Sequence, residues 1–400
     1  MTAIVAGQGL GLGNTSLGLL GNQGLLGKAG QGRSGEQVYV NAATGNLVVQ
    51  QQDERLIGRG PDIGVVRTYN SLATIDGDNN DNWRLGLSRK VTLLSGSLNA
   101  AGSTVRRIGE DGAETVYVWA SGAYISKDGA GSFDKIVYVS ASNTWTWTDG
   151  NSRIQEVYDN ANGGRLTKAT DTDGNSLTIA YNGSGLVSLI TDANGEKTYI
   201  DYDTAAGMTA NITQIRTVDS ANATRTRVRY AYDTANRLST VTVDLSPADN
   251  AITDGKTYIT TYTYDGTSKR VASISQTDGS RAEFSYDASG RVQQVRDVRR
   301  ADIRATTFGY SVAGQTSITD ALGGITKITY QTAAGQNTNQ VLSIVAPAVG
   351  GVSQSTSFTY DANGNVASVT GARGSATVYG YDANEFAKTS QALLSEYKKK

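Results

Sequence analysis

The sequence contains no cysteine and no histidine, and only three prolines in 400 residues. These absences exclude disulfides, Cys/His zinc sites, histidine-ligated haem, cysteine nucleophiles and catalytic triads with an imidazole base. Glutamate is also scarce, with 9 residues against 28 aspartates, whereas glycine reaches 47. A helical chain would favour glutamate and avoid glycine, so the composition predicts strands and turns.

Charge of one sign does not dominate either. The 36 basic and 37 acidic residues leave a net charge of −1, which gives no global field to attract nucleic acid or an anionic membrane. No run of consecutive apolar residues approaches the length of a membrane-spanning helix, so no transmembrane segment is expected. The N-terminus lacks the basic region and uninterrupted apolar core of a signal peptide, which predicts export by another route.

Residues 1–36 alternate glycine with leucine, and this composition predicts a flexible or loosely docked segment. Gly30–Gly35 matches the GxGxxG spacing, but a dinucleotide site needs a strand before it and a helix after it. Here a glycine precedes the motif and a predicted strand at residues 37–40 follows. Near Lys28, Ala29 replaces the hydroxyl residue of a P-loop. We therefore expect no bound nucleotide and no other cofactor.

Residues 37–150 are typical of short, irregularly spaced strands, and residues 151–384 carry a repeated unit. Each unit contains a Tyr-Asp pair followed by a glycine or asparagine turn, and a second Asp-x-x-Gly turn recurs midway. Both turns have a mechanism, because aspartate bonds its own backbone two residues on and glycine adopts positive φ. The clearest Tyr-Asp pairs begin at Tyr158, Tyr286 and Tyr360, and the expected turn glycines are Gly163, Gly174, Gly195, Gly290 and Gly364.

Between the turns, side chains alternate with a period of two, as in Val228, Tyr230 and Tyr232 on one face and Arg227 and Arg229 on the other. A lone hairpin cannot bury such a face in water. The sequence therefore predicts an all-β fold in which consecutive antiparallel hairpins form one long curved or spiralling sheet.

The unit Tyr-Asp-x-x-Gly-Arg-Leu/Val, best seen at residues 286–292, resembles the repeat of the YD-repeat or rearrangement-hotspot (RHS) family of bacterial secreted proteins. Residues 39–48 and 67–71 resemble the opening strands of such proteins. The resemblance covers residues 37–384 and implies a hollow shell that encloses a C-terminal toxin or forms the cocoon of a toxin complex. Members with a cargo end the shell with an Asp-Pro-x-Gly motif, but none of Pro61, Pro247 and Pro347 follows an aspartate.

Three groups of side chains are candidate sites. Asp76-Gly77-Asp78-Asn79-Asn80-Asp81 has oxygen ligands at alternating positions, as calcium prefers, but it lacks the glycine and terminal glutamate of an EF-hand. Residues 171–175 (Asp-Thr-Asp-Gly-Asn) are the second candidate and are already explained as a repeat turn. Trp119, Trp145 and Trp147 could present an aromatic platform to a glycan, or pack as cross-strand pairs in a core. We therefore expect a polar turn, a repeat turn and core packing, and assign no catalytic, cofactor or metal residue.

Residues 385–400 show apolar side chains at helical spacing and end in three lysines, which predicts a short amphipathic helix. The last hairpin, near Tyr381, should leave an unpaired sheet edge through which copies could self-associate. We expect a non-catalytic, secreted or cell-surface scaffold that encapsulates or delivers a toxin beyond this chain. The alternative is a cell-surface adhesin that binds a glycan or another cell.

Overall fold

The computed structural model describes residues 2–5, 26, 28–31, 35–72, 79–126, 134–203, 210–219, 221–299, 302–332, 340–361, 365–381 and, for the backbone, 387–393. Strands dominate these residues, and their only helical element is a short 3₁₀ turn, η2 (Asn160–Asn162). The strands form two hydrogen-bonded sheets. The fold is therefore all-β, as the sequence predicts.

The first sheet, called the inner sheet below, contains six strands in the order β1-β3-β4-β5-β6, with β2 paired to β3. Its only parallel pair is β1 with β3. The strands are β1 (Ala3–Val5), β2 (Gly30–Gln31), β3 (Glu36–Asn41), β4 (Asn46–Leu56), β5 (Ile63–Asn70) and β6 (Trp83–Leu85).

The second sheet begins with a small barrel. Strands β7 to β14 pair consecutively and antiparallel, and β14 returns to pair with β7 through Arg165 and Lys90. The strands are β7 (Lys90–Ser95), β8 (Thr104–Ile108), β9 (Glu114–Ala120), β10 (Ala123–Ile125), β11 (Lys135–Val139), β12 (Thr144–Thr148), β13 (Gln155–Asp159) and β14 (Arg165–Thr170). Closure removes the sheet edges that these strands would otherwise expose.

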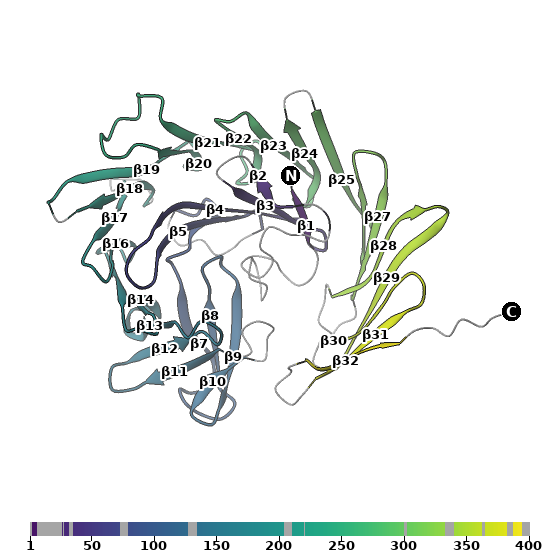
Figure 1. The fold of residues 1–400 in the computed structure, drawn as a ribbon, viewed down its shortest axis with the longest axis horizontal. Coiled ribbons are helices and arrows are strands. Elements are labelled where there is room, and N and C mark those ends of the chain that lie inside the picture. The colour runs from purple at the N-terminus through teal and green to yellow at the C-terminus, as the bar shows by residue number, and fades with distance from the viewer. Residues whose placement is uncertain are drawn as a thin grey trace.

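The same sheet continues from β14 as a long curved wall, β15 to β32, in which each strand pairs antiparallel with the next. The wall curves around the inner sheet (Figure 1). Its strands are β15 (Ser176–Tyr181), β16 (Val187–Thr191), β17 (Lys197–Tyr202), β18 (Ile212–Val218), β19 (Thr224–Tyr232), β20 (Leu238–Asp244), β21 (Thr257–Tyr264), β22 (Val271–Gln276), β23 (Ser280–Tyr286), β24 (Val292–Arg299), β25 (Asp302–Val312), β26 (Gln315–Thr319), β27 (Ile325–Tyr330), β28 (Val341–Val349), β29 (Val352–Tyr360), β30 (Val366–Thr370), β31 (Ala376–Tyr381) and β32 (Ala387–Leu393).

The predicted hairpins of residues 151–384 are confirmed in the described part of the chain. Tyr181, Tyr202, Tyr232, Tyr264, Tyr286, Tyr330, Tyr360 and Tyr381 each end a strand just before a turn. Gly163, Gly174, Gly195 and Gly290 have φ of 77°, 84°, 84° and 79°, as the turn chemistry predicts. Gly364 lies outside the described residues.

Three predictions about the organisation of the chain need correction. The sequence predicts that residues 1–36 are flexible or loosely docked, but β1 (residues 3–5) pairs with β3 as a strand of the inner sheet, with Ala3 and Val5 buried. The expected division at residue 150 is also wrong. The strands of residues 90–150 pair into the same sheet as the repeats, so the two sheets divide between β6 and β7, near residue 88. Residues 387–393 form strand β32 on β31 and no helix. The rest of 385–400 lies outside the described residues.

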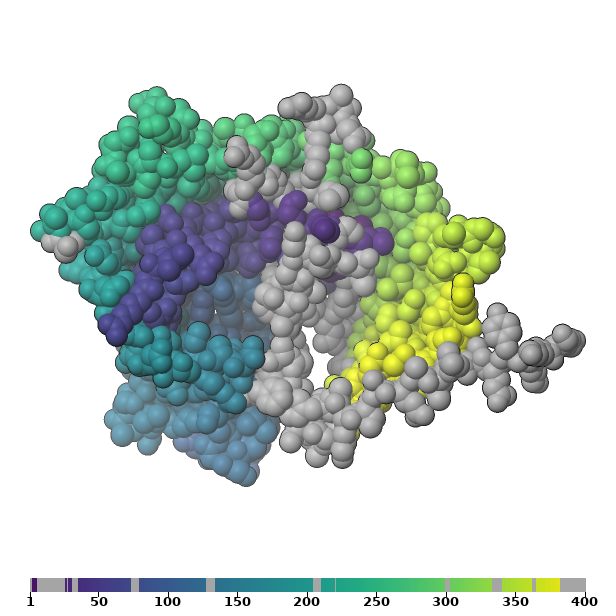
Figure 2. Space-filling view, viewed as in Figure 1, coloured from purple at the N-terminus to yellow at the C-terminus, as the bar shows by residue number. Residues whose placement is uncertain are grey.

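One hydrophobic core joins the three parts. Its buried residues come from the inner sheet, the barrel interior and the inner face of the wall. The space-filling view shows the purple inner sheet within the arc of teal, green and yellow strands (Figure 2). The inner sheet therefore supplies the apolar partner that a single curved sheet lacks.

Candidate functional site: the inner sheet and its contact with the wall

Hydrogen bonds fasten the inner sheet to the wall between residues that lie 132 to 274 positions apart in the chain. The hydroxyl of Tyr69 on β5 donates to the carbonyl of Lys269 at 2.9 Å and accepts from the amide of Val271 at 3.0 Å. The amide of Val292 donates to the carbonyl of Gly45 at 2.8 Å. Further bonds join Thr316 to Ala42, Leu238 to Asp81 and Asn79 to Asn211. The contact therefore extends from β18 to β26.

A buried ionic cluster lies at the centre of this contact. The guanidinium of Arg67 on β5 donates to both carboxylate oxygens of Asp53 on β4, at 2.9 and 3.0 Å. Two wall tyrosines complete it: Tyr230 donates to Asp53 at 2.7 Å, and Tyr262 donates to Glu36 at 2.5 Å. Arg67 also donates to the hydroxyl of Tyr262 at 3.2 Å. Each wall tyrosine thus bonds a carboxylate of the inner sheet.

The electrostatics of the cluster differ between its two carboxylates. Burial raises the pKa of Glu36 to about 7, against the lowering effects of Arg67 and of the hydrogen bonds from Tyr262 and Gln276. Burial would lower the pKa of Arg67, but Asp53 outweighs it and holds the guanidinium charged. The bidentate Arg67–Asp53 pair is therefore the ionic anchor, and Glu36 is the group that titrates near neutral pH.

Aromatic rings pack around the anchor and leave little space. The Arg67 guanidinium lies 4.3 Å from the ring centre of Trp83, which itself packs against Tyr69 and Tyr262. The cavity beside these residues measures about 20 Å³. That volume holds about one water molecule, so the arrangement is suited to fixing two sheets together.

A second ionic cluster fills the barrel. Glu156 on β13 accepts hydrogen bonds from Arg89, Arg107 and Tyr158, and it is 2% exposed. Burial alone would raise the pKa of Glu156, but Arg107 and Arg89 lower it to about 2. The guanidinium of Arg107 also stacks over Trp147, 3.7 Å from the ring centre. The charges are thus compensated inside the barrel.

The three tryptophans that could form a glycan platform pack toward the same interior. Trp145 is fully buried and Trp147 is 7% exposed. The indole of Trp147 donates to Tyr117 and Asp134 at 3.1 and 3.2 Å, and Trp119 packs edge-on against Tyr124. The platform interpretation is therefore wrong for Trp145 and Trp147, because the closed barrel turns them away from solvent.

The candidate calcium ligands in the described part of the chain accept hydrogen bonds from backbone amides. Residues 76–78 lie outside the described part. Asp81 accepts from the amides of Trp83 and Leu238, and Asn79 accepts from the amide of Asp81. Within the described ranges, no group of three or more acidic residues is arranged to hold a metal ion.

The other candidates are explained by local structure. Asp171 accepts from the amides of Asp173 and Asn175 at 3.0 and 2.9 Å, as a repeat turn requires. In the GxGxxG stretch, Gly30 and Gln31 form β2, which pairs with β3, and residues 32–34 lie outside the described part. Lys28 is exposed. Strand β3 follows the motif, as the sequence predicts.

The repeat motif itself is a chain of linked contacts. Asp287 accepts from the amides of Ser289 and Arg291 and from the Arg291 side chain at 2.9, 3.0 and 2.8 Å. The same guanidinium lies 4.2 Å from the ring centre of Tyr310, in the next unit. The hydroxyl of Tyr310 then donates to the carbonyl of Val292 at 2.7 Å. One turn therefore positions the tyrosine of the following unit.

This tyrosine-to-carbonyl bond recurs along the wall. It joins Tyr181 to Leu166, Tyr202 to Val187, Tyr264 to Leu238, Tyr286 to Val271, Tyr360 to Val341 and Tyr381 to Val366. The sequence predicts the tyrosines as scaffold but not this bond. The sequence does contain a signal for this bond, because in several of these pairs the tyrosine lies 15 residues after the residue whose carbonyl it contacts.

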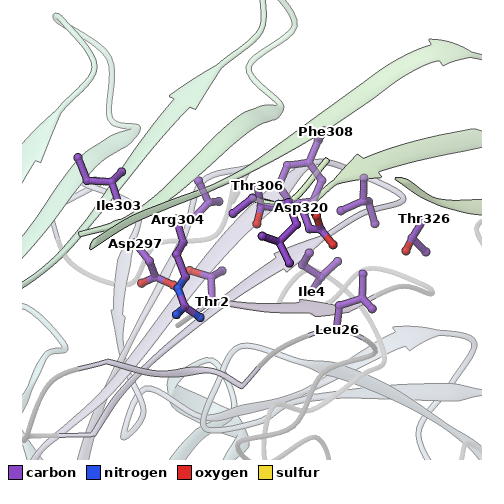
Figure 3. A pocket seen from close by; sticks show the side chains of 14 residues that line it. Thr2, Ile4, Leu26, Asp297, Ile303, Arg304, Thr306, Phe308, Asp320 and Thr326 are labelled. Atoms are coloured by element: carbon purple, nitrogen blue, oxygen red, sulfur yellow. Dashed lines mark hydrogen bonds between the residues drawn. The ribbon is translucent and has the colours of Figure 1, made fainter. Parts of the chain in front are cut away.

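A cavity of about 620 Å³ lies where β1 meets the wall strands β24 to β27. Asp297 and Arg304, which are register partners on β24 and β25, lie near one another at one side, while Ile4 and Leu26 approach from the inner sheet below Phe308 (Figure 3). The inner sheet and the wall therefore separate at this end of their contact.

Comparison with known proteins agrees with this architecture. Residues 158–198 and 354–385 match the family model described as RHS Repeat. Residues 38–117 match the model described as Domain of unknown function (DUF6531). The chain therefore carries RHS repeats, which confirms the resemblance seen in its Tyr-Asp motifs, and the fold it forms is an RHS-type β-scaffold.

Two curated relatives are the tRNA3(Ser)-specific nuclease WapA of Bacillus spizizenii and the tRNA nuclease WapA of Bacillus subtilis. Each is 28% identical over 145 residues, which are 36% of this chain and 6% of the relative. Similar solved structures include the crystal structure of TcdB2-TccC3-Cdc42, with a TM-score of 0.38 and 12% identity over 84% of this chain and 24% of that chain. The crystal structure of TcdB2-TccC3 has a TM-score of 0.40 and 11% identity over 84% and 23%.

No helix in the described residues is long and apolar enough to span a membrane.

Proposed function

We propose that this chain forms part of the wall of a hollow RHS-type shell in a secreted or cell-surface protein, and that the shell encloses a toxin or effector polypeptide. The chain has a structural role in this proposal and no enzymatic one. The nuclease activity named for the WapA relatives belongs to proteins of which this chain matches 6% of the length. We therefore assign the described residues to the scaffold.

The observation that carries the proposal is a change in burial along the inner face of the wall. Cross-strand pairing places Ile344 of β28 opposite Ile328 of β27, and Val369 of β30 opposite Phe358 of β29. Ile328 is fully buried, whereas Ile344, Phe358 and Val369 are only half-buried. No residue after Tyr330 belongs to the buried core of the described chain. This part of the inner face offers an apolar surface to further polypeptide.

The edge of the sheet supports the same proposal. Among the described residues, β32 pairs only with β31, so its other side is free to accept a further strand. A next hairpin would extend the wall, and in its absence a second copy could pair there. Self-association through this edge is part of the proposal.

The test is limited proteolysis of the full protein encoded by the gene from which this chain comes, with the fragments identified by mass spectrometry. We expect polypeptide enclosed by the wall to resist cleavage while the wall is folded. Phe358→Asp on the inner face should increase cleavage of that polypeptide, whereas Ser357→Asp, its neighbour on the outer face, should not. Equal cleavage in both variants and the parent would contradict enclosure.

A further inference from the structure

The second sheet branches at β14, and the branch leaves a cleft. At one end of β14, Arg165 pairs with Lys90 of β7 and closes the barrel. At the other end, Lys168 and the next two residues pair with β15, which leads into the wall. The two partners of β14 diverge, and a cavity of about 460 Å³ lies between β7 and β8 on one side and the start of β16 on the other. We call it the branch cleft.

The branch cleft is lined by five cationic side chains and by no carboxylate. The cations are Arg84, Arg89, Lys90, Arg106 and Arg165. In a chain with a net charge of −1, such a concentration of one sign requires an explanation. Some of these charges are compensated from outside the cleft: Arg89 pairs with Glu110 and Glu156, and Arg106 makes a long pair with Glu114 at 3.3 Å.

Two of the cations lack such compensation. Neither Lys90 nor Arg165 forms an ion pair within the described part of the chain, and Lys90 is exposed. The Nε atoms of Arg106 and Arg165 are buried and have no hydrogen-bond partner. A buried donor without a partner is unfavourable, so a bound acceptor in the cleft would be favoured.

The position of Arg165 comes from a local exception to the repeat. In the units at Asp233 and Asp287, the arginine four residues later pairs with the aspartate. In the unit at Asp159, Gly163 and Gly164 both adopt left-handed φ, and Arg165 follows six residues after the aspartate. Asp159 instead accepts from Asn162.

Arg165 is thereby released from its own turn. Its guanidinium stacks 4.1 Å from the ring centre of Tyr181, which also lines the cleft. Stacking fixes the plane of the guanidinium while its N–H edge stays available to an acceptor.

We propose that the branch cleft binds a phosphate or sulfate group of an anionic ligand. Tetrahedral oxyanions match the site because their oxygens accept from several guanidinium and ammonium donors at once. The volume lies within the range of small-molecule sites, so there is room for a group attached to the anion. This site is independent of the proposed shell function.

The test is isothermal titration calorimetry of the 400-residue chain with inorganic phosphate, inorganic sulfate and glycerol phosphate, all at one ionic strength. We expect binding of phosphate or sulfate with a dissociation constant of about 1 mM or lower. Tighter binding of glycerol phosphate would indicate a phosphorylated small molecule, whereas equal binding would indicate the free anion.

The double variant Lys90→Gln/Arg165→Gln should weaken binding at least about tenfold. The charge-matched control is Lys135→Gln/Lys168→Gln, which removes two exposed lysines outside the cleft and should bind as the parent does. If the first double variant does not fold, Lys90→Gln alone provides the test, since Lys90 is exposed. No heat of binding at about 10 mM of any probe, or equal loss in both double variants, would overturn the proposal.

Discussion

The hydroxyl of Tyr286 donates a 2.7 Å hydrogen bond to the carbonyl of Val271, the first residue of β22. The amide of the same valine donates to the hydroxyl of Tyr69, from the inner sheet. Both polar groups of this buried backbone unit are therefore satisfied by tyrosines, one from the wall and one from the inner sheet. Val271 therefore takes part both in the tyrosine-to-carbonyl bond of the repeat and in the contact between the wall and the inner sheet.

Removing one of these hydroxyls should destabilise the wall. Tyr286→Phe leaves the Val271 carbonyl without its partner and should lower the free energy of unfolding by about 1 kcal/mol. Tyr199→Phe is the control, because the Tyr199 hydroxyl makes no hydrogen bond to the described residues and its ring stacks with Arg216 as before. Denaturant unfolding followed by tryptophan fluorescence measures both; an equal loss would contradict the role of the Tyr286 hydroxyl.

The repeat turns should require glycine for backbone reasons alone. Gly174 has φ of 84°, and no atom lies within 4 Å of the position its Cβ would take. Gly174→Val should therefore cost about 1 kcal/mol or more through strain. Gly183 is equally open but has no left-handed φ, so Gly183→Val should leave the melting temperature close to that of the parent. Similar melting temperatures for both variants would show that the turn was misassigned.

The barrel seam should be far less tolerant than the turn beside it. A Cβ on Gly164 would lie 1.8 Å from the carbonyl oxygen of Val91, whereas one on Gly163 would meet nothing within 4 Å. Both residues have left-handed φ, so both alanine variants carry backbone strain. Only the variant at Gly164 adds a steric clash with Val91. Gly164→Ala should lower the melting temperature well below that of Gly163→Ala, in differential scanning calorimetry. Equal melting would mean that β14 does not close on β7.

Breaking the ionic anchor should loosen the inner sheet. Arg67→Ala leaves Asp53 buried without its cation, which costs about 3 to 5 kcal/mol. The control Arg55→Ala removes an ion pair in which Arg55 is 61% exposed, and such pairs contribute about 0 to 1 kcal/mol. Hydrogen exchange measured by mass spectrometry should show faster exchange in β3 to β5 for Arg67→Ala only. Unchanged exchange would contradict an anchoring role.

The cluster should also make stability depend on pH. The pKa of Glu36 is raised from 4.5 to about 7 in the folded chain. The contribution of Glu36 to folding stability is therefore fully present below pH 4.5, and it is lost as the pH rises toward and through 7. Glu36→Gln should flatten the decline in stability between pH 5 and pH 8, as followed by denaturant midpoints.

Glu156 provides the contrast for that experiment. Its pKa is lowered to about 2, so its contribution is present above pH 4.5 and is lost only as the pH falls toward 2. Glu156→Gln should reduce stability without changing the slope between pH 5 and 8. A Glu36→Gln variant with the parent's slope would contradict the assignment of Glu36 as the titrating group.

The local rules of the repeat were accessible from the sequence. Asp287 caps its turn, Gly290 takes its positive φ and Tyr286 ends its strand through bonds that span a few residues. Such bonds depend on residue type and spacing, and a period of two marks which side chains share a face. Hairpin order, turn chemistry and the RHS resemblance therefore follow from the sequence alone.

Only the tertiary structure decided what each face meets. The alternation of side chains along their strand is the same whether Trp145 and Trp147 lie on an outer platform or in a core. The strand pairing of Arg165 with Lys90 closes the barrel and buries both side chains inside it. Residues 385–400 carry apolar side chains at helical spacing, yet pairing with β31 makes residues 387–393 a strand. The Arg67–Asp53 anchor and the branch cleft likewise depend on contacts between distant segments, whose energy comes from burial that a one-dimensional pattern does not contain.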